Sequence, residues 1–85
     1  MNKFQLHAEV CYTIDYSGVS VLNKQTHKTI FISYPEAAVW LVLNQKYTQD
    51  KSINLIGAIL DDIEEDSLKY VNSCISKWKD LGLVK

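Results

Sequence analysis

Arginine is absent from the chain, and acidic residues slightly outnumber basic ones: nine lysines stand against ten Asp and Glu residues, for a net charge of −1. Neutralisation of backbone phosphates supplies most of the affinity of DNA-binding proteins, which therefore usually carry a basic excess. The charge balance argues against a dedicated nucleic-acid-binding domain, and we expect no nucleic-acid partner.

Cysteine and histidine are also scarce. Cys11 and Cys74 lie far apart in the chain of 85 residues, whereas secreted proteins of this size usually carry several disulfides. Neither His7 nor His27 has a Ser, Cys or carboxylate at a spacing typical of a catalytic dyad or triad. We expect two reduced, buried thiols, two solvated histidines, no metal, no cofactor and no catalytic site.

Long apolar runs are missing as well. No stretch approaches the roughly 20 apolar residues of a membrane-spanning helix, and the opening residues MNKFQLHAEV contain no apolar signal core. With one proline and three glycines, the chain does not have the composition of a disordered segment. We expect a single folded domain over residues 1–85, cytoplasmic and without a membrane partner.

The first half of the chain has the pattern of β-strands. In AEVCYTID, residues 8–15, side chains alternate with a period of two, and the following DYSG is typical of a type I turn. VSVLN (19–23) and KTIFIS (28–33) are rich in β-branched and aromatic residues. These segments predict a three-stranded antiparallel meander.

The second half changes to helical patterns. Ser33 and Glu36 fit a capping box with Ser33 as N-cap, which favours a helix over the apolar run 37–43. Because this helix is apolar nearly all round, we expect it at the centre of the domain, with Trp40 as a core anchor.

Two further helices are predicted. One covers about residues 52–61, and its expected apolar stripe consists of Leu55, Ile56, Ile59, Leu60 and Ile63. The other opens with the acidic EEDS (64–67), buries Trp78, and stops at Gly82 as a C′ residue in the left-handed conformation. The expected fold class is α+β, a winged-helix-like arrangement in the order β-β-β-α-α-α.

The third predicted strand is an edge of the meander. Thr29-Ile30-Phe31-Ile32 contains no proline or glycine and is apolar on both faces, and only His27 and Lys28 add polarity, at one end. An unprotected edge of this kind suits β-augmentation, in which an extended peptide adds a strand. The alternative is that a terminus or a second copy of the chain covers it.

Four segments in this order, GVSVLN, KTIFIS, SYPEAAVWLVL and CISKWKDLGLV, resemble the PqqD-like family, the precursor-peptide recognition elements of ribosomal peptide maturation systems. The resemblance covers residues 9–84. The chain departs from the family's usual residues at Ile32, Ser33 and Trp78, and these substitutions keep capping capacity and side-chain volume.

The resemblance implies a protein that is not an enzyme. Members of the family hold the leader segment of a precursor peptide as an added strand beside the third strand, in a groove walled by the third helix. They present the core segment to a modifying enzyme, such as a radical SAM enzyme, a cyclase or a protease. The implied peptide-binding residues are Lys28, Thr29, Ile30, Phe31 and Ile32 on the strand, and Lys69, Asn72, Ser73 and Ser76 on the helix.

Two other functions remain open. A winged-helix nucleic-acid-binding regulator would share the architecture, but it needs a basic recognition helix, and the third helix here opens with acids. A self-associating scaffold would pair two third strands across a twofold axis. The chain is accordingly expected to be a monomer or a homodimer.

Overall fold

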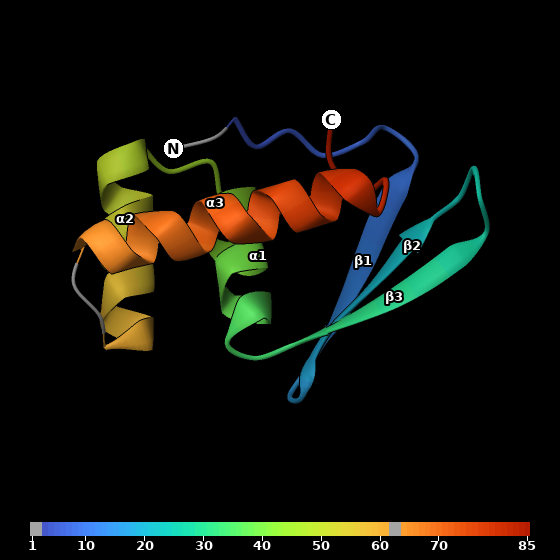
Figure 1. Ribbon diagram of the computed structural model, residues 1–85. Helices are drawn as coiled ribbons and strands as arrows, with labels where there is room; N and C mark the ends of the chain where they lie inside the picture. Colours follow the sequence, from blue (N-terminus) through green and yellow to red (C-terminus); the bar gives the residue numbers. More distant parts are fainter. Residues whose placement is uncertain (1–2, 62–63) are drawn as a thin grey trace.

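The computed structural model describes residues 3–61 and 64–85 of the chain. The strands are β1 (Val10–Asp15), β2 (Gly18–Asn23) and β3 (Lys28–Ser33), and the helices are α1 (Glu36–Asn44), α2 (Gln49–Leu60) and α3 (Glu64–Asp80). The sheet has the order β1-β2-β3, both strand pairs are antiparallel, and the helices lie to one side of it (Figure 1). The predicted α+β class and the β-β-β-α-α-α order are confirmed.

The hairpin between β1 and β2 is closed by Asp15. Its Oδ1 accepts hydrogen bonds from the backbone N–H of Ser17 at 2.7 Å and of Gly18 at 3.1 Å, and from the Ser17 hydroxyl at 2.7 Å. The hydrogen bonds from Ser17 favour the charged form and lower the pKa of Asp15. Gly18 is required by close packing, because a Cβ there would clash with the backbone carbonyl oxygen of Ile32 and lie 2.7 Å from Cζ of Phe31.

The β2–β3 connection depends on Asn23, which the sequence analysis treated only as part of a polar turn. Its Oδ1 accepts hydrogen bonds from the N–H groups of Gln25 and Thr26, at 2.9 and 3.2 Å. Its Nδ2 donates to the carbonyl oxygen of Gly82 at 3.0 Å. This buried amide therefore shapes the turn and also ties the sheet to the end of α3.

The predicted capping box at α1 is wrong. Ser33 is the last residue of β3, opposite Gly18, and Pro35 occupies the N-cap without a side-chain cap. The Glu36 carboxylate instead accepts a hydrogen bond from Nε1 of Trp78 at 2.8 Å. The Trp78 indole is fully buried, and Glu36 supplies the acceptor for its N–H.

Helix α2 begins earlier than the predicted residue 52, because Thr48 caps it: the Thr48 hydroxyl accepts a hydrogen bond from the Lys51 N–H at 3.2 Å. The predicted stripe is only partly correct. Ile56 is buried, but Leu55 and Ile59 are exposed, and Ile63 lies outside the described residues. The buried face of α2 is shifted toward its first half, where Ser52 and Ile53 lie in the core.

The end of α3 is as predicted. Gly82 has φ of +77°, and its N–H bonds to the carbonyl of Lys79 at 3.0 Å. The N–H of Leu83 reaches back to the carbonyl of Trp78 at 2.9 Å, which completes a Schellman motif. Leu83 is fully buried, so the chain folds back onto the core after the helix.

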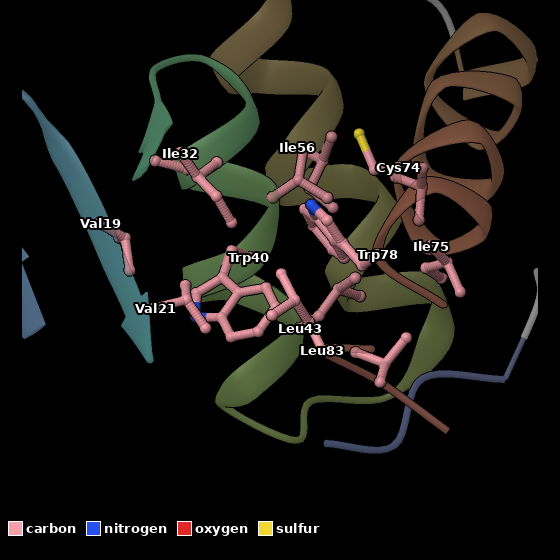
Figure 2. Packing of buried hydrophobic residues seen from close by; sticks show 14 of the residues in the cluster. Val19, Val21, Ile32, Trp40, Leu43, Ile56, Cys74, Ile75, Trp78 and Leu83 are labelled. Carbon is pink, nitrogen blue, oxygen red and sulfur yellow. The ribbon is translucent and has the colours of Figure 1, made fainter. Parts of the chain in front are cut away.

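The core is built around the two tryptophans, as expected. Trp40 and Trp78 are fully buried and pack edge to face, with ring centroids 5.0 Å apart. Figure 2 shows them between the valines of the sheet and the isoleucines of α2 and α3. From the N-terminal segment, Phe4 packs against both rings, at 5.9 and 6.2 Å, and Leu6 pairs with Val84 in an isolated bridge.

The expectation for the thiols is half correct. Both cysteines are free, and Cys74 is buried. Cys11 is exposed, because the alternation along β1 places it on the face of the sheet that points away from the helices.

Candidate functional site

One side of β3 is unpaired. Its six residues pair with β2 in unbroken register, from Lys28 opposite Asn23 to Ser33 opposite Gly18. Within the described residues, no backbone hydrogen bond reaches the other side of the strand. The N-terminal segment, which could have covered this edge, instead runs beside the C-terminus, where Lys85 N–H bonds to the carbonyl of Gln5 at 2.8 Å.

The direction of each backbone group follows from the first hairpin. Asp15 and Gly18 flank a two-residue turn, so they form a hydrogen-bonded pair. Alternation along β2 then turns the backbone groups of Ser20 toward β1 and those of Val19 and Val21 toward β3.

The same alternation identifies the free groups of β3. Ile32 and Ile30 stand opposite Val19 and Val21, so their backbone groups are directed to β2. The N–H and C=O groups of Thr29 and Phe31 therefore point outward. These two residues provide a donor and an acceptor each along the open edge.

The side chains of β3 divide between its two faces as the apolar pattern predicted. Ile32 is buried and Ile30 is partly buried against the core, whereas Lys28 and Thr29 are exposed. Phe31 is 50% exposed on the outer face.

The N-terminus of α1 connects this edge to α3. Glu36 follows β3 after only two intervening residues, and its carboxylate receives Nε1 of Trp78 and Nζ of Lys77, the latter at 3.1 Å. The face of α3 that carries Lys77 therefore turns toward the start of α1, which follows β3. Figure 1 shows α3 crossing α1, and the chain passing from β3 into the start of α1.

A second pair of side chains lies on this face of α3. The hydroxyl of Tyr70 and the thiol of Cys74 are hydrogen-bonded to each other. Burial is the main cause that raises the pKa of Cys74 to about 11, and the charge of Glu36 adds to it. Burial also raises the pKa of Tyr70 to about 12, with a smaller contribution from Cys74. Both groups are neutral near pH 7, and the thiol is therefore not a reactive nucleophile.

The predicted helix residues fall on two neighbouring stripes. Ser73 lies on the same stripe as Tyr70 and Lys77, since residues three, four and seven apart share a helix face. Lys69, Asn72 and Ser76 form the adjacent stripe, in which Asn72 is half-buried and the other two are exposed. Their part in binding stays a prediction.

Sequence reasoning missed Tyr70, Lys77 and Glu36. The sequence shows Tyr70 and Lys77 beside the apolar stripe of the helix. Which side of α3 faces the start of α1, however, depends on the contact with Glu36.

Two negative findings apply to the described part of the chain. No three His, Cys, Asp or Glu side chains gather into a metal site within residues 3–61 and 64–85. None of the helices in those ranges combines the length and the apolar character needed to cross a membrane.

Comparison with known proteins gives a match in fold. No family model matches the chain, and no curated protein matches its sequence. Among solved structures, TbiB1 in complex with the TbiA(beta) leader peptide aligns with a TM-score of 0.85 over 95% of this chain and 94% of that chain, at 12% sequence identity. The chain has the fold of TbiB1. The fold implied by the resemblance to the PqqD-like family is thus the one observed.

Proposed function

We propose that the chain is a non-catalytic peptide-binding protein, which captures the leader segment of a ribosomally made precursor peptide as a strand added to β3. The observation that carries the proposal is the unpaired outer edge of β3 within the described residues. The structural likeness to TbiB1, whose structure contains a leader peptide, supports it.

The edge would hold a peptide mainly through backbone hydrogen bonds. Thr29 and Phe31 present two donors and two acceptors, and each hydrogen bond contributes about 0.5–1.5 kcal/mol. Because β3 is fixed by its full register with β2, little conformational entropy is lost from the receptor on binding. The backbone hydrogen bonds are the same for any extended peptide. Selectivity for the leader must therefore come from side-chain contacts.

We assign the selective contacts to Phe31 and Ile30 on the strand and to the Tyr70–Ser73–Lys77 stripe of α3. The remaining predicted residues, Lys28, Ile32, Lys69, Asn72 and Ser76, belong to the proposal as flanking positions. The segment of the precursor beyond the added strand stays outside the domain, where a modifying enzyme can reach it. A radical SAM enzyme, a cyclase or a protease would fill that role.

A pair of proline variants tests the proposal. Thr29→Pro removes an outward N–H from the β3 edge, whereas Ile14→Pro removes an outward N–H from the opposite edge of the sheet. Proline at Ile30 is unsuitable, because the N–H of that residue is directed to β2. Binding of a fluorescently labelled leader peptide is measured by anisotropy, and the fold of each variant is checked by circular dichroism.

We expect Thr29→Pro to weaken leader binding by at least roughly tenfold, the equivalent of one or two hydrogen bonds. Ile14→Pro should bind like the parent chain. Equal affinity of both folded variants and the parent would show that β3 is not the binding edge.

The same variants address self-association. If two copies paired through β3, light scattering would give a mass that falls on dilution, and Thr29→Pro would yield a monomer. We expect instead that the parent chain and the Thr29→Pro variant give the same mass in light scattering, and that neither mass falls on dilution.

A further inference from the structure

Phe31 is the large side chain on the outer face of β3. The residues of the strand alternate between the two faces of the sheet, so Phe31 shares the outer face with the small polar residues Thr29 and Ser33. Its side chain is 50% exposed, although its backbone lies in the middle of a strand that is paired to β2 along its whole length. A large apolar surface is therefore presented to solvent at the edge where the proposed peptide strand would lie.

The position of the Phe31 ring is restricted by β2. A Cβ built on Gly18 would lie 2.7 Å from Cζ of Phe31, so the tip of the ring packs against the bare backbone of that glycine. Aromatic side chains that cover a glycine of a neighbouring strand stabilise the pairing of the two strands. One side of the ring is thus held by the sheet, and its exposed part can contact a further strand without rearrangement of the domain.

The outer face around Phe31 offers no partner for a charged side chain. By the same alternation, its outward neighbours on β2 are Ser20, directly opposite, and Leu22, on the diagonal. Among the outward-facing strand positions of the described sheet, only Asp15 is charged, and its carboxylate is occupied by hydrogen bonds within the hairpin turn. A charged peptide residue beside Phe31 would lose hydration and gain no ionic contact.

We infer that the bound peptide carries an aromatic or β-branched apolar residue at the position directly beside Phe31, with its side chain on the outer face of the sheet. This inference rests on the proposed function, because it names the class of peptide that the β3 edge selects. Side chains at neighbouring positions of paired strands stand on the same face, and aromatic–aromatic and aromatic–β-branched pairs are favourable cross-strand combinations. Phe31 is thereby a specificity-determining residue through its ring, in addition to its outward backbone groups.

A peptide library tests the inference without the natural precursor. Displayed random peptides of about 12 residues, roughly twice the length of β3, are selected on the immobilised parent chain, on Phe31→Lys and on Thr13→Lys. Thr13→Lys is the matched control, because Thr13 stands in the same outward row of the sheet, opposite Ser20, but on β1 at the far edge. Circular dichroism checks that each variant is folded.

On the parent chain, one position of the enriched peptides should favour valine, isoleucine and the aromatic residues. On Phe31→Lys, this position should change to aspartate or glutamate, because an ammonium replaces the ring, and the other positions should keep their preferences. Thr13→Lys should select the same peptides as the parent. A general preference for strand-forming residues would persist in Phe31→Lys, so a change at one position identifies the contact with Phe31.

A double-mutant cycle with one selected peptide measures the size of the contact. Replacing the aromatic or β-branched residue of the labelled peptide by alanine should weaken binding to the parent roughly two- to fivefold. The same replacement should hardly change the affinity for Phe31→Ala, because the ring is already absent. This measurement decides the question also where Phe31→Lys does not fold, and equal losses on the parent and on Phe31→Ala overturn the inference.

Failure of this inference and failure of the proposed function give different results. If the selected peptides lose affinity for Thr29→Pro but Phe31→Lys selects the same residues as the parent, the peptide edge is supported and the role of the Phe31 ring is wrong. If the selected peptides bind Thr29→Pro as tightly as the parent, or no peptide is enriched on the parent, the proposed function is contradicted and this inference with it.

Discussion

Glu36 is the residue that joins the start of α1, just after β3, to α3. It follows the last strand by two intervening residues, and its carboxylate bonds to two consecutive residues of α3, Lys77 and Trp78. The Trp78 indole is fully buried, whereas the Lys77 side chain is 60% exposed. The two bonds should therefore contribute very unequally to stability.

Glu36→Ala should lower the free energy of unfolding by about 1–3 kcal/mol, because it leaves a buried indole N–H without an acceptor. Lys77→Ala removes only an exposed ion pair and should cost less than about 1 kcal/mol. Urea denaturation of the two variants measures the difference. Equal losses of unfolding free energy in the two variants would mean that the hydrogen bond to Trp78 does not stabilise the fold more than the ion pair with Lys77.

Stability should also fall at alkaline pH. The pKa of Cys74 is raised to about 11 from an ordinary value of 9.0, and that of Tyr70 to about 12 from 10.0, both mainly by burial. The folded state holds both groups neutral to a higher pH than the unfolded chain does. Their contribution to the free energy of unfolding is therefore fully present below pH 9. Above pH 9 it is lost, because the groups ionise first in the unfolded chain.

We therefore expect the free energy of unfolding to decline from about pH 9 upward. Cys74→Ala removes the thiol and should flatten this decline between pH 9 and 11, although the variant is less stable overall. An identical slope in the parent and in Cys74→Ala would contradict the assignment.

At the scale of elements, α3 presents two candidate stripes to a peptide, and a matched pair of serines distinguishes them. Ser73 and Ser76 are both exposed, but only Ser73 shares a stripe with Tyr70 and Lys77. Ser73→Arg should weaken leader binding by roughly tenfold through bulk at the peptide wall, and Ser76→Arg should change it less. Anisotropy titrations measure the affinity of both variants for the leader. A larger loss of affinity for Ser76→Arg would mean that the peptide contacts the Lys69–Asn72–Ser76 stripe instead.

The elements themselves could be predicted because their signals are local. The alternation in β1, the apolar run of α1 and the left-handed Gly82 each depend on a few neighbouring residues. The prediction of a capping box at Ser33 was wrong because the hydrogen-bond partner of Glu36 lies 42 residues away in the sequence. No local sequence pattern indicates such a partner. The start of α2 was missed because Thr48 was not recognised as its cap.

The candidate site was predictable to the same extent. The apolar edge of β3 is evident from its own sequence, and the pairing with β2 identifies Thr29 and Phe31 as the outward residues. The orientation of α3 is a tertiary property, set by Glu36, so the helix residues were predicted from their distance from the core stripe alone. That criterion selects solvent-facing positions on more than one side of a helix.

At the scale of the whole molecule, the two ends of the described chain are joined to each other and lie apart from the open edge of β3. The N-terminal segment pairs with the C-terminus through the isolated bridge between Leu6 and Val84. The N–H of His7 also donates a hydrogen bond to the carbonyl oxygen of Leu83 at 3.1 Å. This arrangement keeps the N-terminal segment away from β3 (Figure 1). The described chain thus leaves the outer edge of β3 open while its ends are fixed elsewhere.

Hydrogen exchange at single amides, followed by NMR with and without the leader segment of the cognate precursor peptide, tests the open edge most directly. In the free chain, Thr29 and Phe31 should exchange fast and Ile30 and Ile32 slowly, because only the latter bond to β2. On leader binding, Thr29 and Phe31 should become protected. Slow exchange at these two amides in the free monomer, or unchanged fast exchange with the leader bound, would contradict the account.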